Sequence, residues 1–190
     1  VDSITSLAFL NTDLAASFAA VTWLCIEWWH KKKPHFVGLL TGAVAGLATV
    51  TPAAGYIPIW AAVVIGIVSG FVCYFAVQLK NKLKWDDALD VWGVHGVGGL
   101  LGILLLGLFA STKINPDGGV GLIHGVWSFF GKQAAAGFGA AAYAFGFTYL
   151  FLAAINMVTP VRVSGAHEIG LDEAMHGESA YLLDDDNGPA

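Results

Sequence analysis

Five long apolar runs constrain the fold of this chain more than any other feature. The runs cover residues 6–29, 36–50, 59–79, 88–110 and 133–157. The chain is 56% hydrophobic and only 12% charged, whereas soluble domains carry roughly 25% charged residues. Because about 20 apolar residues cross a bilayer as a helix, we predict an all-α fold. It should be a polytopic membrane helix bundle with five transmembrane helices.

The lysines of the connections predict how these helices are oriented. Lys31, Lys32 and Lys33 follow the first run, and Lys80, Lys82 and Lys84 follow the third. The positive-inside rule places such clusters in the cytoplasm. We therefore predict an N-terminus outside the cell, a multi-pass protein of the cell (inner) membrane at residues 1–160, and a cytoplasmic tail at residues 161–190. Residues 184–190 are predicted to be disordered.

Several classes of partner and cofactor are not expected. The net charge of −5 indicates no nucleic-acid partner. Cys25 and Cys73 lie inside apolar runs and are predicted to be buried, without a disulfide. The sequence has no metal-ligand spacing and no phosphate loop, so we expect no metal and no cofactor. The chain begins at Val1; we expect no signal peptide in it, and we expect a processed chain, an excised piece or part of a longer polypeptide.

Glycines recur every four residues within three of the runs. They are Gly38, Gly42 and Gly46 in the second run, Gly66 and Gly70 in the third, and Gly98 and Gly102 in the fourth. Small residues at this spacing form a smooth stripe that lets another helix approach closely. The pattern predicts a tightly packed bundle.

His95 is the residue that best indicates chemistry. It is predicted to lie five to seven residues inside the helix at 88–110, which is a depth of roughly 8–11 Å. Ionisable groups within a membrane are costly and are functional candidates by default. An imidazole with an ordinary pKa of roughly 6.5 can also handle protons near neutral pH. A core histidine bonded to a backbone carbonyl remains the structural alternative.

Acidic residues surround this segment and the first run. Asp86, Asp87 and Asp90 precede or open the fourth helix and are predicted to cap it; a direct role in proton release is the alternative. Glu27 is predicted near the inner interface, within reach of water, and Asp13 lies deeper and needs a partner. His95 has no second histidine at its depth, so its polar partner is expected from another chain or a missing segment.

Four ordered motifs resemble one known family. Residues 86–96 read Asp-Asp-Ala-Leu-Asp-Val-Trp-Gly-Val-His-Gly, residues 51–56 Thr-Pro-Ala-Ala-Gly-Tyr, and residues 7–12 Leu-Ala-Phe-Leu-Asn-Thr. The tail carries Gly170-Leu171-Asp172, His176-Gly177-Glu178 and Ala180-Tyr181. These segments are similar to the pore-histidine, helix-end, first-span and tail motifs of the ammonium transporter (Amt) family. The resemblance covers the last five of that family's eleven spans and its cytoplasmic tail.

The resemblance implies a function and a set of roles. His95 would conduct the substrate, with ammonium losing its proton before ammonia passes along a histidine-lined apolar pore. The residues that would support the pore or its helices are Asp87, Asp90, Val91, Gly93 and Thr51. The residues that would form the regulatory tail are Gly170, Leu171, Asp172, His176, Gly177, Glu178 and Tyr181. The implied partners are ammonium or ammonia, the lipid membrane, the N-terminal half of the same transporter, two further copies in a homotrimer, and a PII-type regulatory protein.

Two other functions remain open at this stage. The first is an ammonium sensor that uses the same membrane fold to control a signalling module. The second is a membrane enzyme with His95 as general base, which lacks an evident second catalytic group. We expect that the protein is not an enzyme.

Overall fold

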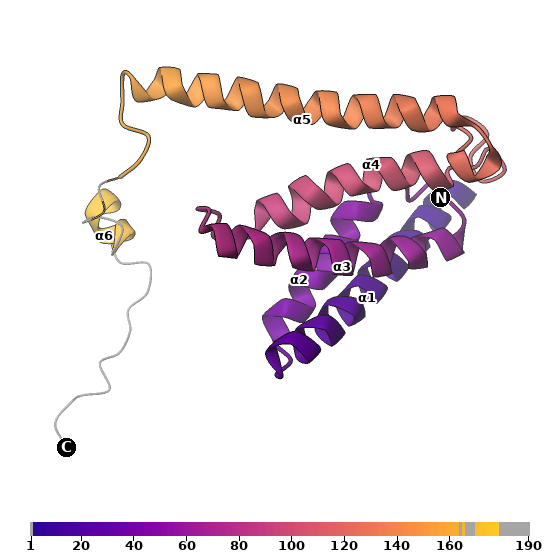
Figure 1. The fold of residues 1–190 in the computed structure, drawn as a ribbon, viewed down its shortest axis with the longest axis horizontal. Helices are drawn as coiled ribbons and strands as arrows, with labels where there is room; N and C mark the ends of the chain where they lie inside the picture. The colour runs from indigo at the N-terminus through magenta and orange to yellow at the C-terminus, as the bar shows by residue number, and fades with distance from the viewer. Residues whose placement is uncertain (1, 164, 166–169, 179–190) are drawn as a thin grey trace. The chain divides into compact units, whose positions relative to one another are not determined.

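The computed structural model describes residues 2–163, 165 and 170–178, and these residues contain helices, turns and connecting segments but no strand. The helices are α1 (Ser3–Lys31), α2 (Phe36–Val50), α3 (Ile59–Leu83), η1 (Trp92–Val97), α4 (Gly98–Phe109), η2 (Leu122–His124), α5 (Trp127–Asn156) and α6 (Leu171–His176). Figure 1 follows them along the chain. The chain divides into two compact units, residues 1–142 and 143–190, which are described separately.

The helices confirm the all-α membrane fold. In the described part of the chain, four helical segments are long and apolar enough to cross a bilayer: α1, α3, η1 with α4, and α5. Helix α2 is apolar but has only 15 residues. At 1.5 Å per residue it extends about 22 Å, less than the ~30 Å of a bilayer's hydrocarbon core. The second predicted span is therefore shorter than its four companions.

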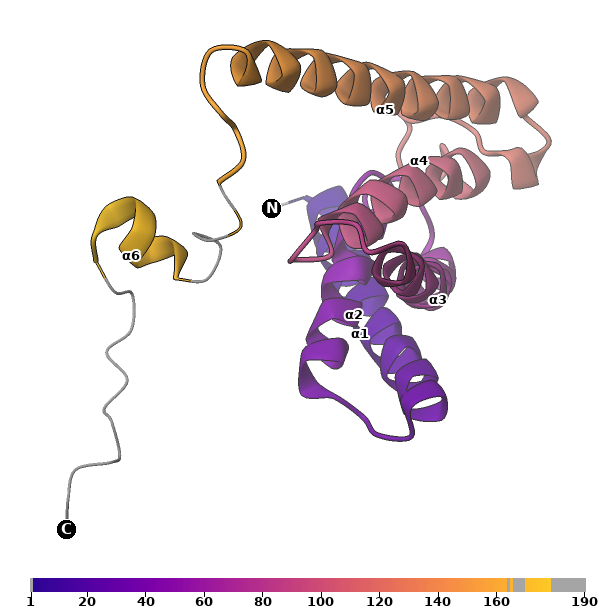
Figure 2. The same cartoon turned by 60° about the vertical axis from the view of Figure 1, so that its left-hand side comes forward.

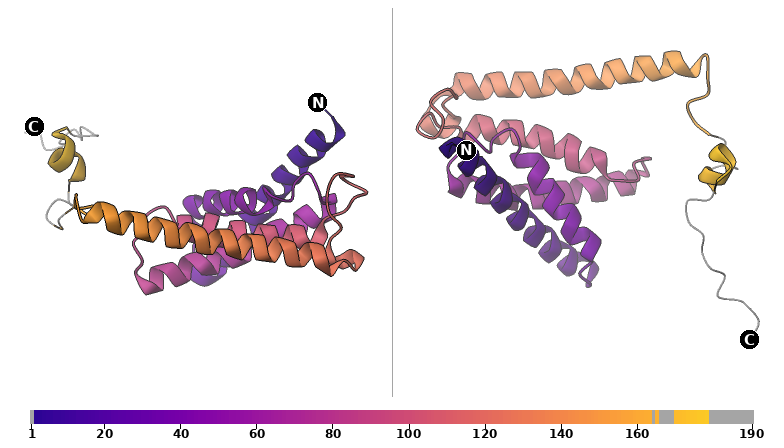
Figure 3. Two further views of the ribbon diagram at one scale, coloured as in Figure 1. Left: turned by 90° about the horizontal axis from the view of Figure 1, so that it is seen from above. Right: turned by 180° about the vertical axis from the view of Figure 1, so that it is seen from behind.

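Helices α2 and α3 connect the elements of the first unit, because each of them contacts α1, α4 and η1. Helix α1 packs against both α2 and α3, and α4 packs across α2 and α3, an arrangement that Figures 2 and 3 show from other sides. The glycine stripes lie at these crossings, as predicted. A methyl group on Gly42 would meet the Trp23 side chain, one on Gly66 the backbone of Ala15, and one on Gly98 the Thr49 hydroxyl. The stripes therefore let the helix backbones approach closely.

One buried amide ties the start of α1 to the connection between α2 and α3. The Asn11 Nδ2 donates hydrogen bonds to the carbonyl oxygens of Ala54 (2.8 Å) and Ile57 (3.0 Å). Residues 51–56 form a turn, and its buried carbonyls would be costly without such donors. Asn11 therefore holds this end of the bundle together.

Both lysine clusters lie at the opposite end of the bundle. The C-terminal end of α1 meets α3 through His30 and Tyr74, whose Nδ1 and hydroxyl oxygen are 2.8 Å apart. At the same end, Lys31 and Asp90 line one pocket, and Asp90 pairs with Lys80. Successive helices thus alternate in direction, as the lysine pattern predicts. Which end faces the cytoplasm stays a prediction.

Two predicted helix starts are wrong. The helix carrying His95 begins near Trp92 instead of residue 88, because Asp90 adopts a left-handed conformation with φ = 56°, which cannot continue an α-helix. Helix α5 begins at Trp127 instead of residue 133, after Gly125 with φ = 86°. The loop before α5 is therefore shorter than predicted, and His95 lies only about 5 Å into its helix.

Candidate functional site

The site is built on the connection between α3 and α4. Asp87 caps the helix that follows: its Oδ1 accepts from the Val91 N–H and its Oδ2 from the Trp92 N–H, each at 2.9 Å. A carboxylate at this position satisfies free donors and complements the positive end of the helix dipole. The predicted capping role is therefore observed for Asp87.

Asp90 does not cap the helix through its side chain. Its Oδ1 lies 2.7 Å from the Lys80 Nζ of α3, and Lys80 also donates to the Asp87 carbonyl oxygen at 2.6 Å. The Lys80 side chain is only 7% exposed, while that of Asp90 is 29% exposed. We call Lys80, Asp87 and Asp90 the Lys80 cluster. It joins the end of α3 to the turn before His95.

His95 lies in a π-helical segment, η1, which spans Trp92–Val97. Wider turns of this kind are often found at functional sites. One side of η1 packs on α3, because a methyl group on Gly93 would come within 2.7 Å of the Val77 Cγ2. The neighbouring Val94 is buried in a core cluster with Val77 and Tyr74. The segment around His95 is thus seated closely on α3.

The His95 ring lines a cavity of about 200 Å³ between η1 and α2. The other lining residues are Val37, Leu40, Thr41, Val44, Leu89 and Val94. Thr41 is the only one of these with a polar side chain, and its hydroxyl donates to the Val37 carbonyl oxygen at 2.8 Å. Within the described residues, no hydrogen bond reaches the His95 ring. An imidazole therefore stands among nearly apolar walls, exposed at the surface of this chain.

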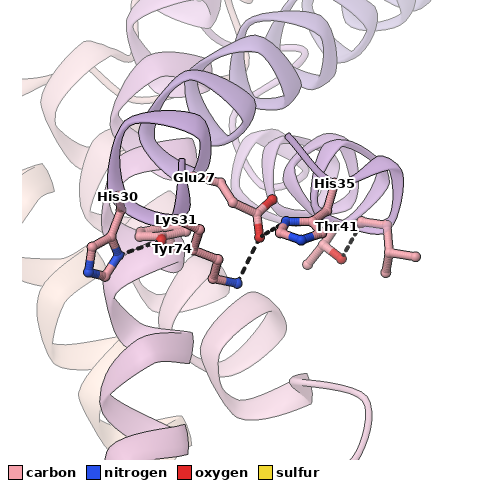
Figure 4. Close-up of polar contacts among 7 residues, drawn as sticks. Glu27, His30, Lys31, His35, Thr41 and Tyr74 are labelled. Carbon is pink, nitrogen blue, oxygen red and sulfur yellow. Dashed lines mark hydrogen bonds and ion pairs between the residues drawn. The ribbon is translucent and has the colours of Figure 1, made fainter. Parts of the chain in front are cut away.

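A larger pocket of about 530 Å³ adjoins this cavity, because Val37 and Thr41 line both. Its polar lining includes Glu27, Lys31, His35 and Asp90. The Glu27 Oε1 lies 2.8 Å from the Lys31 Nζ and 3.3 Å from the His35 Nδ1, and Figure 4 shows the carboxylate between them. We call Glu27, Lys31 and His35 the Glu27 cluster. It closes the connection between α1 and α2.

The Glu27 side chain is more buried than the predicted access of water to it implies. The side chain is only 5% exposed, because it folds against the first turn of α2, where a methyl group on Gly38 would collide with the Oε2. That turn lacks a side-chain cap, so the carboxylate compensates the positive end of the α2 dipole. Cys25 is exposed instead of buried, whereas Cys73 is buried as predicted. Asp13 is exposed on α1.

The remaining predicted residues lie in different places. Thr51 ends α2, with its hydroxyl donating to the Leu47 carbonyl oxygen at 2.6 Å, and it does not line the His95 cavity. Val91 contributes its N–H to the Asp87 cap. In the second unit, Gly170 (φ = 85°) and Gly177 (φ = 69°) flank α6, which contains Leu171, Asp172 and His176. Tyr181 and the end predicted to be disordered lie outside the described residues.

Sequence reasoning missed Lys80, which it treated only as a topology signal. Cys73, Val77 and Lys80 follow at positions i, i+4 and i+7 of α3 and so share one face. Because Lys80 shares a face of α3 with the apolar residues Cys73 and Val77, this spacing could have predicted that the Lys80 side chain is buried. In the described residues, no three His, Cys, Asp or Glu side chains are grouped so that they could hold a metal.

The apolar helices, their glycine-mediated crossings and a histidine at an apolar cavity define a polytopic membrane protein. The description "Ammonium Transporter Family" belongs to the family model that matches residues 1–181. The chain therefore belongs to the ammonium transporter family, and the resemblance of its four motifs is confirmed. It is a multi-pass membrane protein.

Known relatives match nearly the whole chain. An ammonium transporter of Bacillus subtilis is 42% identical over 185 residues, covering 95% of this chain and 45% of the relative. The ammonium transporter Amt1 of Archaeoglobus fulgidus is 40% identical over 175 residues, covering 92% and 44%. These relatives are named as transporters and not as enzymes. The chain spans less than half the length of either.

Solved structures agree with the fold. The crystal structure of Saccharomyces cerevisiae Mep2 matches with a TM-score of 0.83 at 37% identity, covering 92% of this chain and 41% of that one. A structure described as a sensor Amt protein matches with a TM-score of 0.80 at 30% identity, covering 93% and 43%. The chain therefore has the fold of part of an Amt protein.

Proposed function

We propose that this chain forms part of an ammonium transporter, in which His95 lines the path of the substrate. The observation that carries the proposal is the His95 ring at a cavity whose other walls are apolar except for the Thr41 hydroxyl. A bare ammonium ion is costly in such surroundings. A neutral imidazole can both donate and accept a hydrogen bond. The apolar walls and the neutral imidazole together favour loss of a proton from ammonium and passage of ammonia along the ring.

The predicted support residues have distinct tasks in this proposal. Asp87, Asp90, Val91 and Gly93 hold the start of η1, through the cap, the ion pair and the close contact with Val77. Thr51 ends α2 at the far side of the bundle. The first four residues stabilise the segment that carries His95, Thr51 stabilises the end of α2, and none of the five needs to touch the substrate.

The exposed position of His95 supports a further part of the proposal. The N-terminal half of the same transporter would cover the His95 cavity and supply the polar partner that the ring lacks among the residues the structure describes. The assembled protein would form a homotrimer with the lysine-rich end of the bundle in the cytoplasm. We place it in the cell (inner) membrane on the same grounds.

The tail is proposed to be the site of regulation by a PII-type protein. Gly170 and Gly177 have left-handed backbones that other residues rarely adopt, and they start and stop the short helix α6. Asp172 lies in the first turn and His176 in the last, where their charges suit the helix dipole. Glu178 directly follows Gly177. Tyr181 is also proposed to belong to the regulatory segment.

The test of conduction is the ammonium-evoked current on a solid-supported membrane. The polypeptide that carries this segment should give a saturable current, and His95→Ala should abolish or alter it while the protein still folds. Unchanged saturable currents in the variant would refute the role of His95.

A second candidate function is an ammonium sensor, which the match to a sensor Amt structure favours. The same preparation separates the two functions. Ammonium binding without current or flux would identify a sensor, whereas flux would identify a transporter.

Deletion of residues 170–181 tests the tail. Activity or its regulation should be impaired, while insertion into the membrane is retained. Loss of membrane insertion would show that the tail is required for folding and not for regulation.

A further inference from the structure

Lys80 is an unusual residue for its position. It lies in the last turn of α3, yet its side chain is almost completely buried beside the segment that carries His95. Its ammonium group meets the Asp90 carboxylate at 2.7 Å and the Asp87 carbonyl oxygen at 2.6 Å. The neighbouring Lys82 and Lys84 are exposed. Burying a charged group is costly unless other groups compensate the charge. We therefore ask what the buried Lys80 ammonium group holds in place.

The face of α3 that carries Lys80 contacts the His95 segment at three places. Cys73 is opposite Gly98, where a methyl group would come within 3.2 Å of the sulfur. Val77 is opposite Gly93 in the same way. Lys80 is opposite Asp90. The first two contacts are apolar and fix the distance between the helices, and the third adds an ion pair at this crossing.

The third contact acts on the backbone at the start of η1. Asp90 has a left-handed backbone with φ = 56°, and its carbonyl oxygen accepts the first helical hydrogen bond, from the Val94 N–H at 2.9 Å. Asp87 caps the same turn through its side chain and receives Lys80 on its carbonyl. Lys80 therefore holds both residues that start the helix, a few residues before His95.

A charged side chain is poorly suited to simple packing here. Buried ion pairs often contribute less stability than apolar side chains of similar size, and their best-attested use is to select one arrangement among several. The apolar contacts at Cys73 and Val77 already pack the helices together. The remaining role of the ion pair is therefore to orient the segment that carries His95.

We propose that Lys80 is a positioning residue for ammonium conduction, which holds Asp87 and Asp90 so that the His95 ring stays on the wall of its cavity. The inference rests on the proposed function of His95. It assigns to Lys80 an effect on the path of the substrate without any contact with the substrate.

The test compares Lys80→Met with Lys80→Arg in the polypeptide that carries this segment, with Lys82→Met as the matched control. Misplacing a group on the reaction path by about 1 Å costs on the order of tenfold to hundredfold in rate, so we expect currents about tenfold lower in Lys80→Met. The half-saturating ammonium concentration and the pH profile of the current should also shift. Lys80→Arg should restore both in part, and Lys82→Met should match the parent protein.

A second measurement follows the segment itself. Amide hydrogen exchange at residues 91–97 should be about twofold faster in Lys80→Met, as expected for a weakened helix cap. It should recover in Lys80→Arg.

The outcomes separate the two proposals. Unchanged exchange, or a current that falls only in proportion to the amount of folded protein with the same half-saturation and pH profile, would overturn the positioning role. No current from the parent protein would overturn the proposed function and the link to conduction, while exchange would still show whether Lys80 holds the turn.

Discussion

The Glu27 cluster and the Lys80 cluster lie at the same end of the bundle and use the same kind of interaction. Each contains one buried charge with partners that are more exposed. In the Glu27 cluster the partners are Lys31 and His35, on either side of the connection between α1 and α2. In the Lys80 cluster the partners are the side chain of Asp90 and the backbone of Asp87.

The difference lies in what each buried charge holds. Glu27 has two basic partners and the first turn of α2, so several groups share its compensation. Lys80 has one carboxylate and one carbonyl, and both belong to the turn that starts the His95 helix. The first cluster closes a connection, whereas the second determines the backbone of a candidate functional segment. The structural role of an ion pair thus depends on which backbone segment its partners hold in place.

Asp90→Ala should have the largest effect on stability. It removes the carboxylate that pairs with the buried ammonium of Lys80, and stranding a buried charge costs about 3 kcal/mol. A denaturant titration of the protein in detergent measures the loss in the free energy of unfolding. A change near zero would show that water or another group compensates Lys80.

Gly38→Ala should have the next largest effect, because it disturbs the Glu27 cluster from outside. The added methyl group collides with the Glu27 carboxylate, and such overpacking costs about 2 kcal/mol. Gly99→Ala is the matched control, since no atom lies within 4 Å of its methyl position; it should gain up to about 1 kcal/mol from helix propensity. Equal effects of the two variants in the same titration would contradict the buried position of Glu27.

Lys31→Met should cost less, about 1 kcal/mol. Its ammonium group is paired with Glu27 but its side chain is 43% exposed, and His35 with the start of α2 remains to compensate the carboxylate. Lys33→Met, at an exposed position of the same connection, is the control and should change nothing. A loss as large as that of Asp90→Ala would remove the distinction between the clusters.

Lys80→Met should have the smallest effect on global stability, about 0.5 kcal/mol, because it strands Asp90 at a position that water reaches. The comparison with Asp90→Ala is the sharpest one, since both variants break the same ion pair. Denaturant titrations of the two variants, run side by side, measure the asymmetry. Equal losses would show that the exposure of the two partners does not decide the cost.

Much of the fold could be predicted from local features of the sequence. Runs of apolar residues determine that helices form and that they suit a membrane, because the backbone must satisfy its own hydrogen bonds in lipid. Four-residue glycine spacing indicated the faces that pack, and Gly42, Gly66 and Gly98 do lie at the crossings. The Asp87 cap was equally predictable, because it depends on residues four and five positions away.

The candidate site was predicted in part from the sequence and in part was revealed only by the tertiary structure. The sequence by itself determined that His95 is an ionisable group near the start of an apolar helix and that the chain resembles the ammonium transporter family. Only the tertiary structure decided where that helix starts, that Lys80 and Glu27 are buried, and that Thr41 and Val37 face His95 across a cavity. These features arise between α1, α2, α3 and η1, which are far apart in the chain. Burial and ion pairing depend on distances between such segments, and local sequence patterns do not specify those distances.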